Sequence, residues 1–313
     1  PEGVKVLKDS TDLEEVVKAK ATEAATATTK LPDGVTVRVK EVKAGTVPAT
    51  TATGVQIPAT AVVEYVKDGK VVASKEVEVP VTVVGSTPKS VVVFEGDTVE
   101  AKTVQDAVTP GTDGTKGNPA IPEDLTKTPG KKEVTVPVTY EGVKDPEQVK
   151  VPVTVLPVAK GEVTVPKGAT VDKVKEVAKV KATEVATSAD FKAKLPEGSK
   201  DVEVGAITEE VLAAITSEAG SNKGTVKVPV TYTVDGVKYT KDAAITVNVV
   251  GSNADPVYVV EGDKPEVDKV KDAVKPGEGG TVQDPMEVDL PNTNDKVGAT
   301  DVTAVSYTHL TLP

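Results

Sequence analysis

The sequence predicts a mainly β protein built from several small domains in tandem, and three observations lead to this prediction. Valine dominates the apolar residues and threonine the polar ones, and β-branched side chains favour strands. Apolar and polar residues alternate with period two in runs bounded by Gly, Asp and Pro, a pattern typical of half-buried hairpin strands. The same motifs also return along the chain at a nearly constant spacing, which indicates a repeat architecture.

The composition limits the size of any single core. The chain has 313 residues, enough for two to four ordinary domains. Aromatic residues make up only 3% of it, with no Trp, so Val, Ala, Ile and Leu must fill the interior. Each of these side chains buries less area than a ring, which favours several small cores over one deep core.

Self-comparison reveals the repeats directly. Residues 91–111 (VVVFEGDTVEAKTVQDAVTPG) and 257–277 (VYVVEGDKPEVDKVKDAVKPG) share 12 of 21 positions at an offset of 166. Three shorter motifs recur in the same way: KATEAAT and KATEVAT at 20–26 and 181–187, LPDG and LPEG at 31–34 and 195–198, and VVGS at 83–86 and 249–252. The offset grows from 161 to 166, as small insertions in diverged copies would produce.

Each half of the long period opens with a strand-like run and a short helical pattern. In the stretch VTVPKGATVDKVKEVAKV, the residues Val171, Val174, Val177 and Ala178 have helical spacing behind Thr170, which predicts a helix with a threonine N-cap.

Each complete half closes with two alternating runs around a turn, as at 133–157 and 226–250. Asp68–Gly69 and Asp235–Gly236 are the dipeptides that two-residue hairpin turns prefer. Proline lacks a backbone N–H, so prolines within these runs predict sheet edges or bulges at Pro80, Pro137, Pro152 and Pro229.

We therefore expect five parts, at 1–86, 87–157, 158–252, 253–304 and 305–313. The first three are complete repeats, two of them long variants. The fourth lacks the closing hairpin, so we expect an incomplete domain with weak packing or poor order over 278–313. The connectors at 85–88, 156–157 and 251–256 are short and contain proline, which restricts bending and favours a head-to-tail rod.

The plan of strand, short helix, LPDG-like loop and closing hairpin resembles the Rib/alpha-like repeat, or Rib domain, of Gram-positive bacterial surface proteins. Residues 87–157 fit best, because their hairpin VTVPVTYEGVKDPEQVKVPVTV has the Tyr–turn–Lys–Asp arrangement of the family. The sequence Tyr140–Glu141–Gly142–Val143 departs from the usual YPDG turn. The resemblance implies tandem immunoglobulin-like β-sandwich repeats, each with a short helix, arranged end to end in a cell-wall-anchored extracellular protein.

The last nine residues, 305–313 (VSYTHLTLP), do not continue the repeat and resemble a translated sequencing adapter. We expect an artefactual tail there, and His309 is given no functional role. The chain opens on Pro1 rather than Met, so a signal peptide and an anchor are expected outside this sequence.

Several function classes are disfavoured by composition. The net charge is −11 and Arg38 is the only arginine, which argues against nucleic-acid binding. No apolar run approaches the roughly 20 residues that span a bilayer. There is no Cys, and His309 is the only His, so Ser–His and Cys–His catalytic arrangements are absent. We expect no enzyme activity, no catalytic, cofactor-binding or metal-binding residues, and no cofactor.

The paired carboxylates admit a catalytic and a structural interpretation. Glycosidases use two carboxylates, but in clefts usually lined by aromatic rings. For Glu14–Glu15 and Glu209–Glu210 we favour solvated helix faces or first turns of helices, where acids complement the helix dipole.

Four further features have alternatives that the sequence leaves open. The pairs Glu95 with Asp97 and Glu261 with Asp263 predict a turn plus a helix N-cap, with calcium ligands as the alternative. For residues 112–118 we favour a flexible loop, with a metal-binding loop as the alternative. Residues 290–294 resemble a Leu-Pro-x-Thr-Gly sorting signal, but Asn follows Thr, so we treat them as a decoy. Intramolecular Lys–Asn or Lys–Asp crosslinks cannot be placed from sequence.

The leading functional hypothesis is a structural stalk that projects a functional head, outside this sequence, from the cell wall. Its partners would be neighbouring repeats, with a host glycan or protein bound by the head. Two alternatives remain: the repeats themselves bind a host glycan or protein, or they are accessory modules of a large cell-wall enzyme.

Overall fold

The computed structural model separates the chain into two compact units, Pro1–Leu156 and Pro157–Pro313. The structure describes residues 2–27, 30–43, 50, 53–54, 56–197, 199–207, 213–263, 266–277, 280–282, 298–299, 301–302 and 306–308. The division falls beside the predicted limit at residue 157. The predicted limits of the five parts remain predictions.

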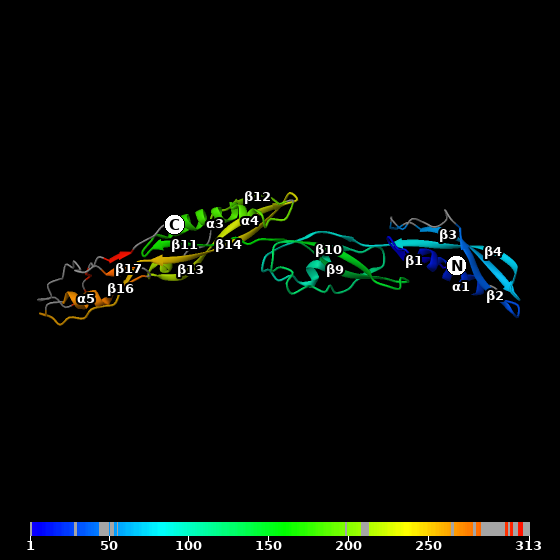
Figure 1. The fold of residues 1–313 in the computed structure, drawn as a ribbon, viewed down its shortest axis with the longest axis horizontal. Coiled ribbons are helices and arrows are strands. Elements are labelled where there is room, and N and C mark those ends of the chain that lie inside the picture. Colours follow the sequence, from blue (N-terminus) through cyan, green and yellow to red (C-terminus); the bar gives the residue numbers. More distant parts are fainter. Residues whose placement is uncertain are drawn as a thin grey trace. The chain divides into compact units, whose positions relative to one another are not determined.

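The first four-stranded sheet of unit 1 is covered on one face by a long helix (Figure 1). Its elements are β1 (Val4–Leu7), α1 (Leu13–Ala27), β2 (Val35–Val42), β3 (Gln56–Lys67) and β4 (Lys70–Val84). The strand order is β1-β4-β3-β2, with β1 parallel to β4 and the other pairs antiparallel. Valine and alanine side chains from sheet and helix form the core, because alternate strand residues and every third or fourth helix residue face each other.

The second sheet of unit 1 has the order β6-β10-β9-β8, again with one parallel pair. The elements of this part are β5 (Thr87–Pro88), β6 (Val91–Phe94), α2 (Ala101–Asp106), β7 (Val108–Thr109), β8 (Gly114–Lys116), β9 (Gly130–Tyr140) and β10 (Glu147–Leu156). Strands β5 and β7 form a separate two-stranded sheet. The core again consists mostly of valines from the hairpin strands β9 and β10.

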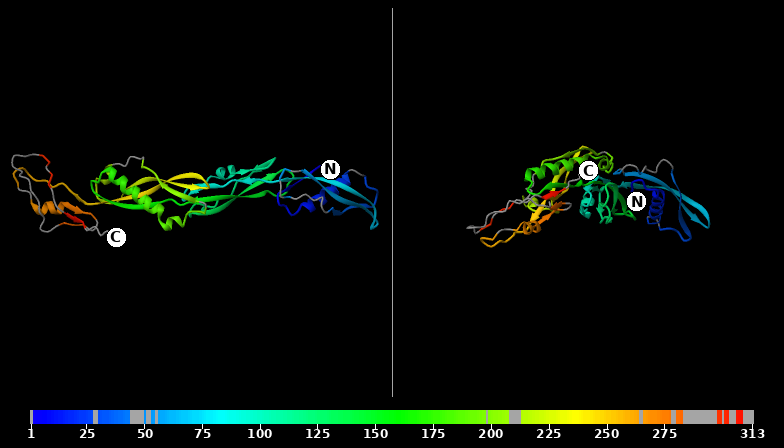
Figure 2. Two further views of the ribbon diagram at one scale, coloured as in Figure 1. Left: turned by 90° about the horizontal axis from the view of Figure 1, so that it is seen from above. Right: turned by 60° about the vertical axis from the view of Figure 1, so that its left-hand side comes forward.

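Unit 2 begins with a sheet of the order β11-β14-β13-β12, in which β11 is parallel to β14. Its elements are β11 (Lys160–Pro166), α3 (Val171–Thr187), α4 (Ala189–Lys192), β12 (Ser199–Val204), a 3₁₀ turn (Ala213–Thr216), β13 (Gly220–Val234) and β14 (Val237–Val250). Figure 2 shows α3 lying along one face of this sheet, and α3 contacts all four of its strands. The strand order and directions are the same as in the first sheet of unit 1.

The last part of unit 2 has shorter elements: β15 (Ser252–Ala254), α5 (Val267–Ala273), β16 (Val274–Pro276), β17 (Gly280–Val282) and β18 (Ser306–Thr308). Residues 257–260 correspond to β6 in the repeat motif but form no strand, and Tyr258 and Val260 are 89% and 71% exposed. Most of the predicted poorly ordered region 278–313 and of the predicted artefactual tail lies outside the described residues, and β18 pairs with β17.

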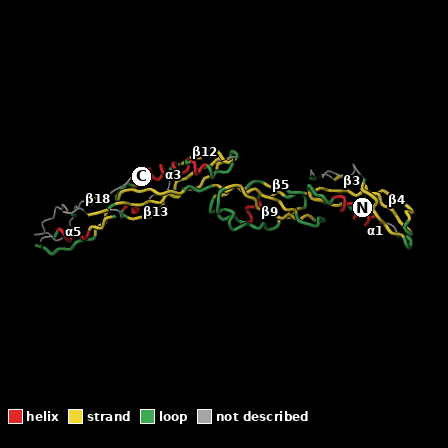
Figure 3. Tube along the Cα trace, viewed as in Figure 1, coloured by secondary structure: helices red, strands yellow, loops and turns green. Residues whose placement is uncertain are grey.

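The prediction of a mainly β chain is confirmed (Figure 3). Both Asp–Gly dipeptides form two-residue hairpin turns, with positive φ at Asp68, Gly69, Asp235 and Gly236. Thr170 caps α3 as predicted, because its side chain accepts a hydrogen bond from the Lys173 N–H at 3.3 Å.

The four strand prolines lie at partly open edges rather than at bulges. Each stands directly before the residue at which its strand gains a second partner: Pro80 before Val81, Pro137 before Val138, Pro152 before Val153 and Pro229 before Val230. At such positions the missing N–H interrupts no second ladder, which explains how proline fits into long strands.

In the first sheet of unit 1 and the first sheet of unit 2, the layer that packs on the sheet is a helix, α1 and α3 respectively. Helices α1 and α3 have 15 and 17 residues, longer than the short helix expected. The resemblance predicted an immunoglobulin-like sandwich, which needs a second large sheet. Among the described residues, the sheets other than the three four-stranded ones have only two strands each.

Candidate functional site

A hydrogen-bonded polar cluster holds the linker between the two four-stranded sheets of unit 1. This linker cluster consists of Ser86, Gly111, Tyr140 and Glu147. The Gly111 N–H donates to the Tyr140 hydroxyl at 3.2 Å, and the Tyr140 and Ser86 hydroxyls lie 2.8 Å apart. Glu147 accepts from the Ser86 hydroxyl at 2.6 Å and from the Ser86 N–H at 3.0 Å. The chain of donors thus ends on a carboxylate, which strengthens its bonds.

The sequence places the two side chains by the geometry of the hairpin. Tyr140 is the last residue of β9 and Glu147 the first of β10, so both stand beside the turn. Tyr140 is only 3% exposed, and its burial is the main reason why its pKa is raised above the usual value of 10.0. The neighbouring charge of Glu147 acts in the same direction, because it disfavours a second negative charge.

Two pairs of glycines make a close backbone contact where one sheet is linked to the next part of the chain. A Cβ added at Gly111 would lie 2.7 Å from the Gly85 carbonyl oxygen, so only glycine allows this approach. Gly277 meets Gly251 in the same way in unit 2. Sequence reasoning missed this role, although the signal was present: the VVGS glycine precedes the Pro-Gly glycine by the same interval in both copies.

In unit 2 a second tyrosine binds the connecting segment at Pro157, which leads into the first sheet. The Tyr232 hydroxyl donates to the Pro157 carbonyl oxygen at 2.8 Å, and Tyr232 is 1% exposed. The ring of Phe191, from α4, packs on Tyr232 with 6.3 Å between the centroids. In both units, therefore, a tyrosine near the hairpin turn binds the segment that leads into the sheet.

A lysine and an asparagine meet at the second linker of unit 2. Lys167 Nζ donates to Asn253 Oδ1 at 3.0 Å and to the Ser252 carbonyl at 3.1 Å, and Asn253 also pairs with the backbone of Ala219. Lys167 is exposed. A spontaneous Lys–Asn crosslink needs a desolvated lysine and a buried acid beside it, so this contact has the geometry of an ordinary linker hydrogen bond.

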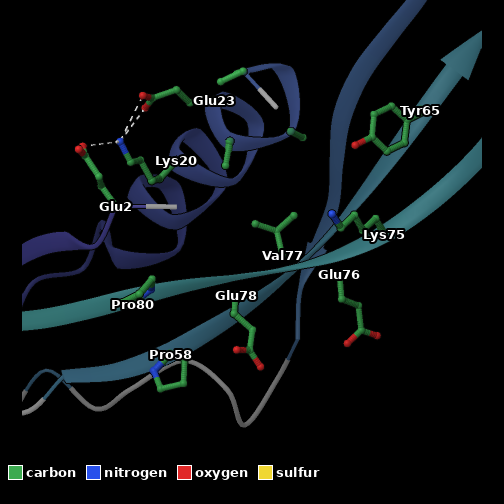
Figure 4. A pocket seen from close by; sticks show the side chains of 13 residues that line it. Glu2, Lys20, Glu23, Pro58, Tyr65, Lys75, Glu76, Val77, Glu78 and Pro80 are labelled. Carbon is green, nitrogen blue, oxygen red and sulfur yellow. Dashed lines mark hydrogen bonds and ion pairs between the residues drawn. The ribbon is translucent and has the colours of Figure 1, made fainter. Parts of the chain in front are cut away.

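A groove lies between α1 and the first four-stranded sheet of unit 1 (Figure 4). We call it the Tyr65 groove; its volume is about 780 Å³, and it is lined by Glu2, Lys20, Glu23, Ala24, Ala25, Ala27, Pro58, Tyr65, Lys75, Glu76, Val77, Glu78 and Pro80. Lys20 pairs with Glu23 at 3.1 Å and lies 3.9 Å from Glu2. No hydrogen bond to the Tyr65 hydroxyl comes from the described part of the chain.

The predicted carboxylate features have structural positions. Glu14 and Glu15 lie in the first turn of α1 as predicted, and Glu14 pairs with Lys18 at 2.6 Å. The predicted N-cap role of Asp97 is wrong, because Glu100 precedes α2 and Asp97 instead accepts from the Phe94 N–H at 3.2 Å, closing the turn after β6. Asp263 likewise lies before Glu266, the residue that precedes α5.

The remaining candidates divide between described and undescribed residues. The predicted flexible loop at 112–118 contains strand β8, so it is partly regular. In the part of the chain that the structure describes, no three His, Cys, Asp or Glu residues group as metal ligands, and no helix is long and apolar enough to span a membrane. Glu209–Glu210, residues 290–294 and His309 lie outside the described residues.

Comparisons with known proteins add no specific identity. No family model and no curated protein matches the chain. Among solved structures, human mucin-like protocadherin EC1-2 is 12% identical, with a TM-score of 0.17 over 53% of this chain and 98% of that one. Drosophila N-cadherin EC1-4 is 10% identical, with a TM-score of 0.17 over 69% and 66% of the two chains. An endo-fucoidan hydrolase from glycoside hydrolase family 107 is 12% identical, with a TM-score of 0.14 over 71% and 38%. Similarity this low carries no argument about function.

Proposed function

We propose that this chain is a non-enzymatic run of spacer domains from an extracellular, cell-wall-anchored bacterial surface protein of the Rib type. Its role is to act as a stalk that projects a functional head. The observation that carries the proposal is the path of the chain through two of the four-stranded sheets, the second sheet of unit 1 and the first sheet of unit 2.

In residues 87–156 the chain enters beside the hairpin turn and leaves at the opposite end. Ser86 is bonded to Tyr140 and Glu147, which flank the turn, whereas β10 runs away from the turn and ends at Leu156, paired with Phe94 of β6. Because β10 has 10 residues, about 33 Å separates the two ends.

The first sheet of unit 2 follows the same path. Pro157 is bonded to Tyr232 near the turn, and β14 carries the chain away over 14 residues, roughly 46 Å, to Val250. A module whose two chain ends lie at opposite poles adds length when it is joined to another. A module with adjacent ends would instead favour a folded-back or inserted arrangement.

The linkers are held rather than loose, which a stalk also requires. The linker cluster fixes Ser86, the glycine pairs allow close backbone approach, and Lys167 bonds to the linker residues Ser252 and Asn253. Held linkers restrict bending between successive sheets. The acidic net charge favours solubility of such an array.

Small-angle X-ray scattering of the full chain tests the stalk. A compact chain of 313 residues has a radius of gyration of about 20 Å. Three sheets in a row span on the order of 110 Å, which corresponds to a radius above about 30 Å. The double variant Tyr140→Phe, Tyr232→Phe is the matched comparison and should broaden the distribution of interatomic distances. A radius near the compact value for the wild-type chain would refute the stalk.

One structural feature favours the alternative in which a repeat binds a ligand directly, namely the Tyr65 groove. Beads coated with the full chain should not attach to host cells if the chain is only a spacer. Specific attachment that a Tyr65→Ala variant abolishes would make binding the primary function.

A further inference from the structure

The first and last strands of the four-stranded sheet of unit 2 lie side by side and run in the same direction. Strand β11 stands at one edge of this sheet, next to β14. The register runs from Lys160 beside Ala244 to Pro166 beside Val250, so all 7 residues of β11 are paired. The chain enters the sheet through β11 and leaves it through β14. A pull on the chain at both ends of the sheet therefore acts on the β11–β14 ladder.

The parallel direction decides how this ladder carries a pull. Tension draws the start of β11 and the end of β14 apart, and the register places these two points at opposite ends of the ladder. The strands must slide along each other before they separate, so their hydrogen bonds are loaded together. In an antiparallel pair the same two points would lie at one end of the ladder, and the bonds would break one after another. Simultaneous loading raises the barrier to unfolding, and that barrier governs the rate of forced unfolding.

Backbone hydrogen bonds continue the ladder beyond both ends of β11. Ahead of the strand, the Ala159 carbonyl oxygen accepts from the Ala244 N–H at 3.1 Å. After the strand, the Lys167 N–H donates to the Val250 carbonyl oxygen at 2.7 Å. The chain is thus bonded to β14 from Ala159 to Lys167.

The two flanking bonds also fix which residues of β11 bond to β14. Every second residue of a strand bonds to a given parallel partner, so the odd-numbered residues between Ala159 and Lys167, such as Val163, bond to β14. The even-numbered residues, such as Thr164, direct their N–H groups away from β14. Pro166 is one of these even-numbered residues, and its missing N–H leaves the ladder uninterrupted.

The inward side of the ladder is closed to water. Val165 of β11 is 2% exposed, and Ile245 and Val247 of β14 are fully buried. Helix α3 packs against β11 on this side. Hydrogen bonds are stronger where the surroundings are apolar, so this backing strengthens the ladder under load.

The second sheet of unit 1 has the same arrangement over a shorter length. The chain enters it through β6, which lies at an edge next to β10, and leaves it through β10. The two strands are parallel, from Val91 beside Val153 to Phe94 beside Leu156. Strand β6 has 4 residues against 7 in β11, so fewer bonds share the load and this ladder should yield at a lower force.

We propose that the β11–β14 and β6–β10 ladders are shear clamps, which let the chain bear tension along its length without unfolding. Projection of a head requires only length, whereas an anchored protein whose far end is bound also meets a pull. The source of the load rests on the proposed stalk function. The clamps themselves rest on the strand order and the register of the two sheets.

Single-molecule force spectroscopy tests the clamp of unit 2 by loading the same sheet in two directions. The full chain contains no cysteine, so a pair of introduced cysteines defines where the handles attach. Lys160→Cys with Ala254→Cys loads β11 from its start and shears the ladder. Lys167→Cys with Ala254→Cys loads β11 from its end and peels the same ladder open. All three positions are exposed, and Lys167→Ser is added to the first pair so that both chains lack that lysine.

The sheared ladder should rupture at a force at least about twofold higher than the peeled ladder, because its bonds break together rather than in sequence. In the shear direction, Val163→Pro should lower the force more than Val163→Ala, which shortens the same side chain but keeps the N–H. Thr164→Pro should leave the force unchanged, because its N–H lies outside the ladder. Handles at Ser90→Cys and Lys160→Cys should release the second sheet of unit 1 at a lower force than the shear pair releases the sheet of unit 2.

Three outcomes would overturn the inference. They are equal rupture forces in the two directions, equal effects of Val163→Pro and Thr164→Pro, and a higher force for the β6–β10 ladder. The comparison of directions uses an unaltered ladder, so it decides the question even if a proline variant does not fold. The clamp and the stalk also fail separately. A compact particle in scattering would contradict the stalk and leave the rupture forces unchanged, whereas equal forces would contradict the clamp and leave the scattering radius unchanged.

Discussion

Gly111 approaches the carbonyl oxygen of Gly85 so closely that a Cβ on Gly111 would lie 2.7 Å from that oxygen. This contact joins the end of the 91–111 motif to the end of the preceding sheet. It explains why the motif closes with Pro-Gly in both copies, since Gly277 makes the same contact with Gly251. The glycines therefore belong to the junctions between sheets and not to their cores.

Substitution of this glycine should loosen the first junction. In Gly111→Ala the new methyl group meets backbone that cannot move independently, so we expect a loss of about 1–3 kcal/mol in local stability. Gly161→Ala is the control, because its methyl group meets the movable side chain of Lys181 at 3.1 Å. Hydrogen exchange of the amides around residues 85–88 measures the effect. Equal protection in both variants would contradict the role of the glycine pair.

Removal of one hydroxyl should weaken the linker cluster. Tyr140→Phe keeps the buried ring but leaves the Gly111 N–H and the Ser86 hydroxyl with one partner fewer. Each lost bond costs about 1 kcal/mol, so the Ser86 amide should exchange roughly five to thirty times faster. Tyr239→Phe, which removes a hydroxyl outside the cluster, should leave this rate unchanged. If the two variants exchange alike, the cluster does not hold the linker.

The same cluster should weaken at high pH. Burial raises the pKa of Tyr140 above its ordinary value of 10.0, so the folded state binds this proton more tightly than the unfolded state. The stabilisation is fully present below about pH 10, and it is lost as the pH rises through the folded-state pKa. Chemical denaturation between pH 9 and pH 12 should show a steeper decline for wild type than for Tyr140→Phe. Parallel curves would show that Tyr140 contributes nothing to the pH dependence.

The local elements could be predicted because their causes are local. The Asp–Gly turns, the Thr170 cap and the edge positions of Pro80 and Pro229 follow from backbone preferences of single residues. The role of Asp97 was harder to predict from the sequence. An Asp side chain can close a turn or cap a helix, and the two roles differ only in which backbone N–H lies within hydrogen-bond distance of its carboxylate. In the structure the Phe94 N–H is the one within reach.

The linker contacts could not be predicted from periodicity. Tyr140 and Ser86 are 54 residues apart and meet only because β9 ends where the linker passes. The length of α1 and α3 was underestimated for a related reason. Their exposed faces alternate Lys, Glu and Thr, and their buried faces rely on alanines such as Ala21 and Ala182, which give a weak apolar signal.

Residues 257–260, which correspond to β6 in the repeat motif, should be less protected from hydrogen exchange than β6. Val91 and Phe94 are 8% and 9% exposed because β6 pairs with Val153–Leu156 of β10. Residues 257–260 share the motif, but no strand of the described residues pairs with them, and Val260 is 71% exposed. Their amides should exchange at least a hundredfold faster than those of residues 91–94, since a segment outside any sheet offers its N–H groups to water. Hydrogen-exchange mass spectrometry of the full chain compares peptides that contain residues 91–94 and 257–260 in one experiment. Because the two segments share the repeat motif, they have similar residue composition and serve as controls for each other. Comparable protection would mean that another segment pairs with residues 257–260, and the description of these residues as an exposed segment outside any sheet would then be wrong.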